Sequence, residues 1–291
     1  MRGIAAMPIV LTLALPVVLP LTAAAADPDY WQASRITNGA IDESSSLAIS
    51  TKYPGIAYTA NDGSEGIIYA VEIATGRVVG RNLIDNFKVG DVEAMAVDRQ
   101  NRIWVADLGA QRSSSSVRAL YMFPEPPLGT HRIDANRYTV YYPGRPNYDV
   151  ETFLLNPVTG HKFLVTKVNS GSAKLLALPA VLTKDHANVT SEVHVSDDLP
   201  QHISDGSFTP NGRWAVIRNN KKAFVLDPAS EWAVDSTTVH LPDSSVLPNP
   251  ESLSFDPDGM KFLVGTEGTP SPLWWVSFDQ ETGTVPSGGG L

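Results

Sequence analysis

The sequence predicts an all-β protein, a β-propeller, and three observations carry this prediction. Five apolar stretches each begin with a polar residue, the opener, and a second polar residue, the closer, follows 14 to 17 residues later. Successive openers lie 48, 58, 53 and 47 residues apart, which fits four-stranded propeller blades with loops of uneven length. Short β-prone runs alternate with Asp-Gly and Asn-Gly pairs, which favour tight turns between strands.

Each repeat supplies one expected blade. The openers are Ser45, Glu93, Glu151, Ser204 and Glu251, and the closers are Asp62, Asp107, Lys167, Arg218 and Glu267. Five openers predict five blades, and a sixth blade in the stretch 125–148 or the stretch 183–204 is the alternative. The last repeat has room for only three strands. We therefore expect the aromatic run 30–36 to supply its outer strand and to close the ring.

The segment 1–26 differs from the rest of the chain. Arg2 precedes an apolar run, and three alanines stand before Asp27. This order is typical of a cleavable secretory signal peptide, while the lack of charge between residues 3 and 26 leaves an uncleaved membrane anchor as the alternative. We expect a signal peptide at 1–26, a single propeller domain at 27–282, a flexible tail at 283–291, and a bacterial protein that is secreted or held in the cell envelope.

The composition limits the expected partners. The chain has 31 acidic and 22 basic residues, a formal net charge of −9, and no cysteine. No basic run with interleaved aromatics occurs, so nucleic acid is not an expected partner. The nucleophile elbow, P-loop, HExxH and CxxC motifs are absent as well. We expect a monomer that takes a small anionic ligand or an ester substrate and is not inserted in a membrane after signal cleavage.

Openers and closers are expected together at one mouth of the central channel. The two innermost strands of a blade are antiparallel, so the start of the first lies beside the end of the second. Side chains alternate along a strand, so the residue two positions before each opener faces the same way. All five of these positions are polar: Glu43, Asp91, Asp149, His202 and Asn249. The predicted mouth is therefore crowded with carboxylates.

Carboxylates packed in one mouth repel one another, and two arrangements relieve this repulsion. The acids either pair with Lys167 and Arg218 or hold a hard cation such as calcium, which prefers oxygen ligands. The sequence leaves both arrangements open. The expected metal ligands are Asp91, Glu93, Asp149, Glu151 and Glu251.

A hydrolase of phosphoesters or related esters is the first functional hypothesis. Carboxylates would hold calcium, the ion would activate water, and basic closers would bind the anionic group. The candidate catalytic residues are Glu93, Glu151, Glu251, Lys167 and Arg218, and the candidate ligand-binding residues are Asn61, Asp62, Asp107, His202 and Glu267. A non-catalytic propeller that binds a ligand or partner at the same mouth is the second hypothesis, and a calcium-dependent lactonase-like enzyme is the third.

These residues resemble a family of secreted bacterial propellers related to the "esterase-like activity of phytase" group. The resemblance is carried by Asn61-Asp62-Gly63, the segment 91–96, the segment 105–109 followed by Arg112 or Arg118, Glu125-Pro126, and Asp149-Val150-Glu151 through Lys167. Arg218, Glu251 and Glu267 also match, while Val92 and Ala94 stand where the family has Trp and Asp. The resemblance covers most of residues 45–268 and implies a propeller with an acidic, calcium-linked funnel.

Overall fold

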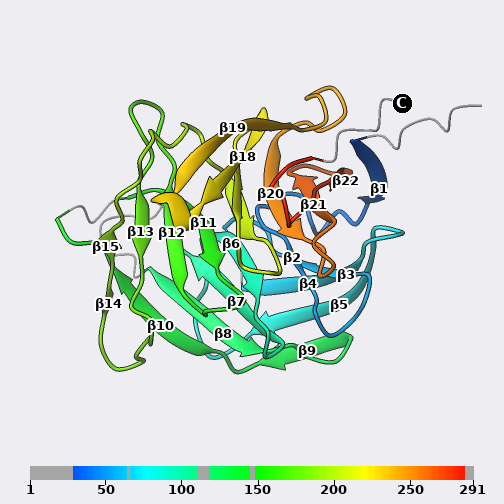
Figure 1. The fold of residues 1–291 in the computed structure, drawn as a ribbon. Coiled ribbons are helices and arrows are strands. Elements are labelled where there is room, and N and C mark those ends of the chain that lie inside the picture. Colours follow the sequence, from blue (N-terminus) through cyan, green and yellow to red (C-terminus); the bar gives the residue numbers. More distant parts are fainter. Residues whose placement is uncertain (1–28, 64–65, 110–117, 145–147, 286–291) are drawn as a thin grey trace, which may run out of the picture.

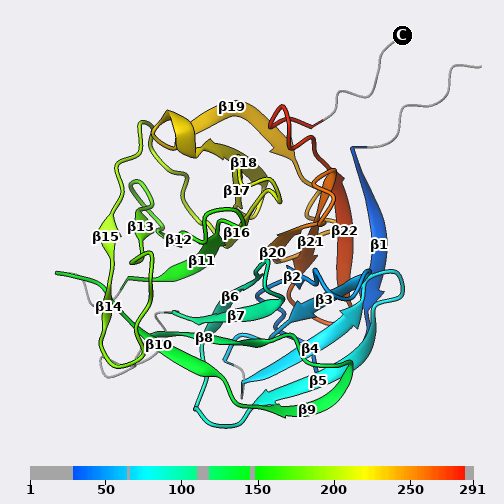
Figure 2. The same cartoon turned by 60° about the horizontal axis from the view of Figure 1, so that its bottom comes forward.

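The computed structural model describes residues 29–63, 66–109, 118–144 and 148–285. Its strands form five sheets arranged in a ring, in chain order (Figure 1 and Figure 2). The five-bladed propeller is therefore confirmed. The expected signal peptide at 1–26 and residues 286–291 of the expected tail lie outside the described residues.

Each blade begins with its innermost strand and continues outward. Blade one contains β2 (Ala48–Ile49), β3 (Ile56–Thr59), β4 (Ile67–Glu72) and β5 (Arg77–Ile84). Blade two contains β6 (Val92–Val97), β7 (Arg102–Asp107), β8 (Ala119–Pro124) and β10 (Asn136–Tyr141). Blade three contains β11 (Val150–Leu155), β12 (Lys162–Thr166), β13 (Leu175–Ala177) and β15 (Ser191–Glu192).

The last two blades follow the same plan. Blade four contains β16 (Asp205–Phe208), β17 (Ala215–Arg218), β18 (Lys222–Asp227) and β19 (Ala233–His240), with the short 3-10 helix η1 (Pro228–Ser230) between the last two. Blade five contains β20 (Pro250–Phe255), β21 (Lys261–Thr266), β22 (Ser271–Ser277) and β1 (Tyr30–Ile36). The first strands of the blades contact one another around the channel.

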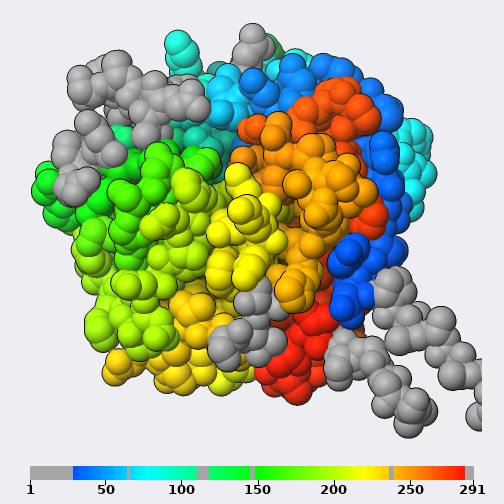
Figure 3. Space-filling view, turned by 90° about the horizontal axis from the view of Figure 1, so that it is seen from above, coloured from blue at the N-terminus to red at the C-terminus, as the bar shows by residue number. Residues whose placement is uncertain are grey.

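The N-terminal segment closes the ring, as the sequence predicts. β1 pairs antiparallel with β22, and Trp31 lies opposite Trp275. In Figure 3 this segment, in blue, lies beside the orange and red surface of the C-terminal blade. The pairing gives blade five its fourth strand and covers the edge that β22 would otherwise expose.

Two further strands explain the longer stretches that could have held a sixth blade. β9 (Gly129–Ile133) pairs in parallel with β5, on the outer edge of blade one. β14 (Asn188–Val189) pairs in parallel with β10, on the outer edge of blade two. Each extra strand comes from the following blade, so it links two neighbours and covers an outer edge.

Five hydrophobic clusters hold the blades together, one between each pair of neighbours. Tyr58 and Tyr121 join blades one and two, and Phe123 packs in the same cluster. Phe153 packs with blade two, and Phe262 with blade four. Full burial of a large apolar side chain contributes about 1.5–3 kcal/mol, so removing any of these rings would loosen an interface between blades. The core is thus distributed around the ring and leaves the channel ends for polar groups.

No helix in the described part of the chain is long and apolar enough to cross a membrane.

Candidate functional site

Three glutamates occupy equivalent β-bulges at the start of innermost strands. Glu93 is an extra residue in β6 relative to β7, and the pairing register shifts around it. Glu151 and Glu251 interrupt the pairing of β11 with β12 and of β20 with β21 in the same way. A bulge bends its strand and redirects the extra side chain. The carboxylates converge, because Glu151 interacts electrostatically with both of the others.

Backbone hydrogen bonds show which closers are equivalent. The amides of Asp62, Lys167 and Glu267 each bond the carbonyl oxygen of the residue two positions before the opener. In blade two the amide of Leu108 makes this bond, to the carbonyl oxygen of Asp91. Asp107 therefore lies one residue before the position that is equivalent to the other closers. The expected equivalence holds for three closers and is corrected at Asp107. Its side chain accepts a hydrogen bond from the Asp91 amide at 2.9 Å, so it supports the loop of the mouth.

Arg218 is not exposed at the mouth, which corrects the expectation from the sequence. Its carbonyl oxygen accepts the amide of the opener Ser204, so Arg218 itself lies before the matching position. Its side chain is fully buried, and the guanidinium donates to the carbonyl oxygen of Ser252 at 3.2 Å. Burial lowers its pKa to about 10, so Arg218 carries a buried positive charge at neutral pH. Arg218 therefore joins blade four to blade five beneath the mouth.

Asp205 is a buried acid that the sequence analysis did not select. It lies opposite Arg218 in the pairing of β16 with β17 and is fully buried. Its carboxylate accepts the amides of Gly206 and Leu253, each at 2.7 Å, and burial raises its pKa. The signal was an acid directly after the opener Ser204, where the other blades place an apolar or small residue.

An acid triad lies on the side of the mouth formed by blades one and two: Asp62 of blade one and Asp91 and Glu93 of blade two. Their carboxylate oxygens lie within 4.8 Å of one another. Asp91 is 3% exposed and Glu93 is 5% exposed, while Asp62 is half-buried. Two separate blades therefore bring three carboxyl groups together at the edge of solvent.

Burial and mutual repulsion raise the pKa values of four glutamates at the mouth: Glu93, Glu151, Glu251 and Glu267. Burial is the largest cause for Glu93, followed by repulsion from Glu151, Asp62 and other acids, and its pKa lies well above the usual range. Burial likewise raises the pKa of Glu151 to about 8 and that of Glu267 to about 6. The pKa of Glu251 is raised by burial too, although nearby cations oppose the shift. Part of the mouth is protonated at neutral pH.

Lys167 is the basic group that reaches the mouth. Its Nζ lies 3.2 Å from Oε1 of Glu151. Burial acts to lower its pKa, but Glu151 and Glu251 outweigh burial and raise it, so Lys167 stays charged. Burial of Glu151 outweighs the attraction of Lys167 in turn, so the contact is a charge-assisted hydrogen bond below about pH 8 and an ion pair above it.

Several other expected site residues surround the triad. Half-buried Asp149 interacts with Glu93 and Lys167, whereas Glu43 is exposed at the edge beside Glu267. The structure therefore brings eight of the expected acids into one cluster: Glu43, Asp62, Asp91, Glu93, Asp149, Glu151, Glu251 and Glu267.

Asn61 and His202, two of the expected ligand-binding residues, make contacts with the loops around the mouth. The Asn61 amide donates to the carbonyl oxygen of Ala40 at 3.0 Å and to Asp42 at 3.2 Å, so it holds the preceding loop in place. His202 is exposed, has a positive φ of 57°, and bonds the Val168 carbonyl through its own amide. Oδ1 of Asn61 also accepts the amide of Glu43 at 3.4 Å, so the Asn61 side chain supports the backbone at the edge of the mouth.

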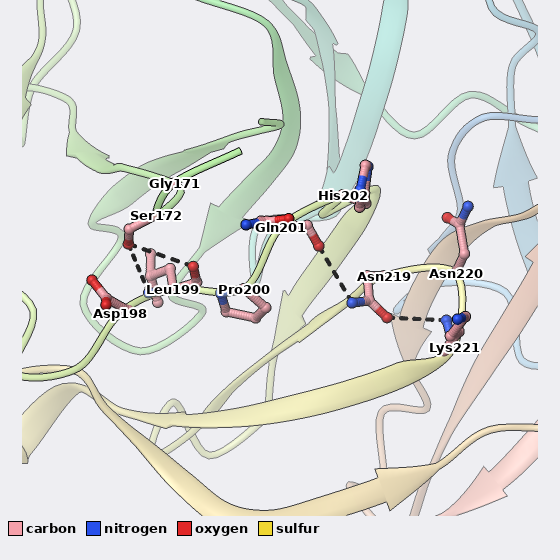
Figure 4. Close-up of a pocket in the computed structure, with 10 residues that line it drawn as sticks. All are labelled: Gly171, Ser172, Asp198, Leu199, Pro200, Gln201, His202, Asn219, Asn220 and Lys221. Carbon is pink, nitrogen blue, oxygen red and sulfur yellow. Dashed lines mark hydrogen bonds between the residues drawn. The ribbon is translucent and has the colours of Figure 1, made fainter. Parts of the chain in front are cut away.

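His202 lines a wide cavity beside the mouth. The cavity measures about 970 Å³ and lies between the loops 171–172, 198–202 and 219–221 of blades three and four (Figure 4). One wall is held by a hydrogen bond from the Leu199 amide to Ser172, and the other by one from Asn219 to the Gln201 carbonyl. The lining is rich in amide, hydroxyl and charged groups, including Lys221. Such a lining suits a polar ligand.

The residues of the triad fit a hard divalent cation. Carboxylate oxygens are the ligands that calcium and magnesium prefer. Oδ1 of Asp62 is buried and has no hydrogen-bond partner among the described residues. Gly109 follows β7 and leaves room for the carboxylates, since a Cβ there would lie 2.5 Å from Cγ of Asp91 and closer still to Glu93. A cation would supply the positive charge that the triad lacks.

Comparison with known proteins shows similarity in solved structures alone. No protein-family model and no curated protein sequence matches the chain. A gluconolactonase from Xanthomonas campestris has 16% identity and a TM-score of 0.45 over 79% of this chain and 70% of its own. The Dos1 propeller has 11% identity and a TM-score of 0.39, and the match covers 77% of this chain and 53% of that one. A chain of the nidogen/laminin complex has 13% identity and a TM-score of 0.46, and the match covers 78% of this chain and 73% of that one. The propeller assignment rests on the five sheets themselves, and the resemblance to the phytase-related group remains a prediction.

Proposed function

We propose that this propeller is a hydrolase of ester bonds that depends on a divalent cation, with calcium as the ion. The observation that carries the proposal is the acid triad, in which oxygens of Asp62, Asp91 and Glu93 lie within 4.8 Å of one another and two of the acids are buried. Burying like charges without a counter-ion is unfavourable. A divalent cation bound at this point offsets that cost and places charge where a reaction can use it.

In this proposal each group at the mouth has a separate role. Asp62, Asp91 and Glu93 hold the ion, and a bound divalent ion lowers the pKa of water and stabilises negative charge on oxygen. Glu151 carries a proton up to about pH 8, so it can donate one to a leaving oxygen at neutral pH. Lys167 keeps its positive charge beside Glu151 and attracts the anionic part of a substrate. Arg218 acts by holding Asp205 and the start of β20 in place.

The adjoining cavity provides space for the organic part of the ester. Its volume of about 970 Å³ is in the range of small-molecule sites, and its polar lining favours hydrogen-bonding substrates. Lys221 and His202 stand there beside the amides of Asn219 and Gln201. We therefore propose phosphate esters and polar carboxylic esters, lactones included, as the substrate class.

A non-catalytic propeller that binds a small anion is the second candidate. The contact between Lys167 and Glu151 favours it, because a lysine held by an acid can serve to balance charge alone. Both candidates bind the divalent cation, but only the hydrolase turns over an ester.

A substrate panel separates the candidates. Phosphate esters, carboxylic esters and lactones are assayed with calcium and with chelator, using the wild type, Glu93→Gln and the exposed control Glu281→Gln. Calcium-dependent turnover that Glu93→Gln abolishes and Glu281→Gln retains supports a hydrolase. Calcium binding without turnover of any ester identifies the binding propeller, and the absence of calcium binding refutes both.

A further inference from the structure

A second cavity lies at the opposite end of the central channel. It measures about 260 Å³ and is lined by the C-terminal halves of β2, β6, β11, β16 and β20 and by the turns that follow them. The acid triad and the three bulged glutamates lie at the starts of inner strands, so the two sites occupy opposite ends of the ring. The walls combine apolar side chains, such as Ile49, Met95, Phe153, Phe208 and Phe255, with the hydroxyl-bearing residues Thr51, Ser207 and Ser254.

The size of this cavity limits what can enter it. An apolar cavity of about 150 Å³ holds a benzene ring, so about 260 Å³ accepts an apolar body of roughly six to eight carbon atoms. Most of the lining side chains are apolar, so a strongly polar body would lose more hydrogen bonds to water than the hydroxyls of Thr51, Ser207 and Ser254 can replace. The cavity therefore selects a small apolar body.

Arg99 supplies the charge at the rim of this cavity. The other described residues that line the cavity carry no charge. It stands in the turn after β6, where the matching turn positions of blades three, four and five hold Pro157, Pro210 and Pro257. Its Nη2 donates to the Pro210 carbonyl at 3.3 Å, which directs the side chain across the opening from blade two to blade four. The carboxylate of the neighbouring Asp98 pairs with Arg102 instead of Arg99: Oδ2 of Asp98 accepts a hydrogen bond from Nε of Arg102 at 2.7 Å.

A smaller basic hollow continues from the same rim. It measures about 160 Å³ and shares Arg99, Leu155 and Pro157 with the apolar cavity. Arg102 and Lys162 line its other side. With Arg99 they give three cations, against the single acid Asp98 among the lining residues.

Lys162 is held in place in this hollow. It is 8% exposed, its Nζ lies 5.2 Å from the centre of the Trp104 ring, and it donates to the Gly160 carbonyl at 2.8 Å. Burial, and then the charge of Arg102, lower its pKa. An anion in the hollow would offset that unfavourable crowding of positive charge.

We propose that this end of the channel binds an amphipathic organic anion, a carboxylate whose apolar body of roughly six to eight carbon atoms fills the 260 Å³ cavity while its head group meets Arg99 at the edge of the basic hollow. An apolar cavity alone does not require a charged ligand, and a basic surface alone does not require an apolar one. Because the two hollows adjoin at Arg99, Leu155 and Pro157, one molecule with both properties can contact both of them. This site is independent of the proposed hydrolase.

Calorimetry with the full chain in buffer free of divalent cations tests the proposal. Sodium octanoate and sodium benzoate carry the charge on an aliphatic and an aromatic body, 1-octanol carries the aliphatic body without charge, and acetate carries the charge without a body. We expect saturable binding of octanoate or benzoate and at least about tenfold weaker binding of octanol and acetate, because a hydrogen bond to a charged group and the apolar contact both contribute. The better of the two carboxylates identifies the shape of the body.

Variants locate the binding. Arg99→Gln should weaken carboxylate binding about tenfold and leave octanol unchanged, since it removes the charge alone. Ala96→Leu, which fills the cavity, should weaken both, and Arg81→Gln is the matched exposed control. Because Arg99 is exposed, its variant keeps the test valid if Ala96→Leu fails to fold. The proposal is overturned if neither carboxylate binds at millimolar concentration, or if Arg99→Gln binds both as tightly as the wild type.

Discussion

Gly109 lies directly against two carboxylates of the acid triad, so Gly109→Ala probes the cation site without changing any ligand. A Cβ at Gly109 would lie 2.5 Å from Cγ of Asp91 and closer still to Oε1 of Glu93. Favourable contacts between carbon atoms begin at about 3.5 Å, so the backbone or both carboxylates must move by about 1 Å. The acids are buried, and they cannot move by this amount while keeping their present arrangement.

The displacement converts into a measurable loss of stabilisation by calcium. Changes to groups that orient metal ligands weaken metal binding by about 10–100-fold. At a calcium concentration of about 100 times its Kd, the wild type gains about 2.7 kcal/mol, and a hundredfold weaker site gains about 0.4 kcal/mol. For a domain of this size about 1 kcal/mol moves the Tm by about 2–4 °C, so the calcium-induced rise should fall from about 5–10 °C to about 1–2 °C.

Thermal unfolding over a calcium titration measures both rises. Gly39→Ala is the matched control, because a Cβ at Gly39 has no atom within 4 Å. Should Gly109→Ala unfold at a much lower temperature without calcium, Asp62→Asn tests the same site at nearly constant side-chain volume. A full calcium-induced rise in Tm for both Gly109→Ala and Asp62→Asn would refute the placement of the ion at the triad.

Four further predictions concern charge and processing. Burial raises the pKa of Glu93 and Glu151, so their contribution to the free energy of unfolding is fully present below about pH 4.5 and is lost as the pH rises through the folded pKa, which is about 8 for Glu151. Urea unfolding without calcium should therefore show falling stability from about pH 5 to pH 8, and calcium should reduce that fall; a flat profile would contradict it. Lys167→Met should lower kcat/KM for phosphate esters by about tenfold or more relative to neutral esters, and an equal loss on both would assign Lys167 to charge balance. Arg218→Ala should cost about 3–5 kcal/mol in urea unfolding, because it leaves buried acids without their cation, and a loss under about 1 kcal/mol would show that the buried charge is dispensable. N-terminal sequencing of exported protein should begin near Asp27, and retention of residues 1–26 would disprove cleavage.

The five blades could be predicted from sequence because the same kinds of residue recur in the same order in each of the five repeats. A polar opener, an apolar strand and a tight turn recur at each blade, and each follows from strand alternation and turn geometry. The added strands β9 and β14 could not be predicted. They pair through backbone groups over two to five residues, and no side-chain pattern marks such a parallel addition to an outer edge.

The identity of the site residues was more predictable than their register. Counting from opener to closer locates the mouth, but it cannot distinguish Leu108 from Asp107 or detect that Arg218 precedes the matching position. Each bulge lies at the second residue of its strand, too near the start for a shift in the alternation of side chains to show. Glu93 therefore looks in sequence like a regular strand residue, and its bulge is visible only in the pairing of β6 with β7.

The sequence left open whether the acids at the mouth pair with basic residues or hold a cation. The positions of the basic residues show where each of these can apply. Lys167 interacts with Glu151 and Glu251, and Arg218 interacts with Glu251 and the buried Asp205. These pairs serve blades three, four and five. The leading electrostatic partners of Glu93 are all acids, and each raises its pKa. Internal pairing therefore neutralises one side of the mouth, while the triad on the side of blades one and two must take up protons or a cation. Because protons leave as the pH rises, the demand for a cation at the triad grows in the same direction.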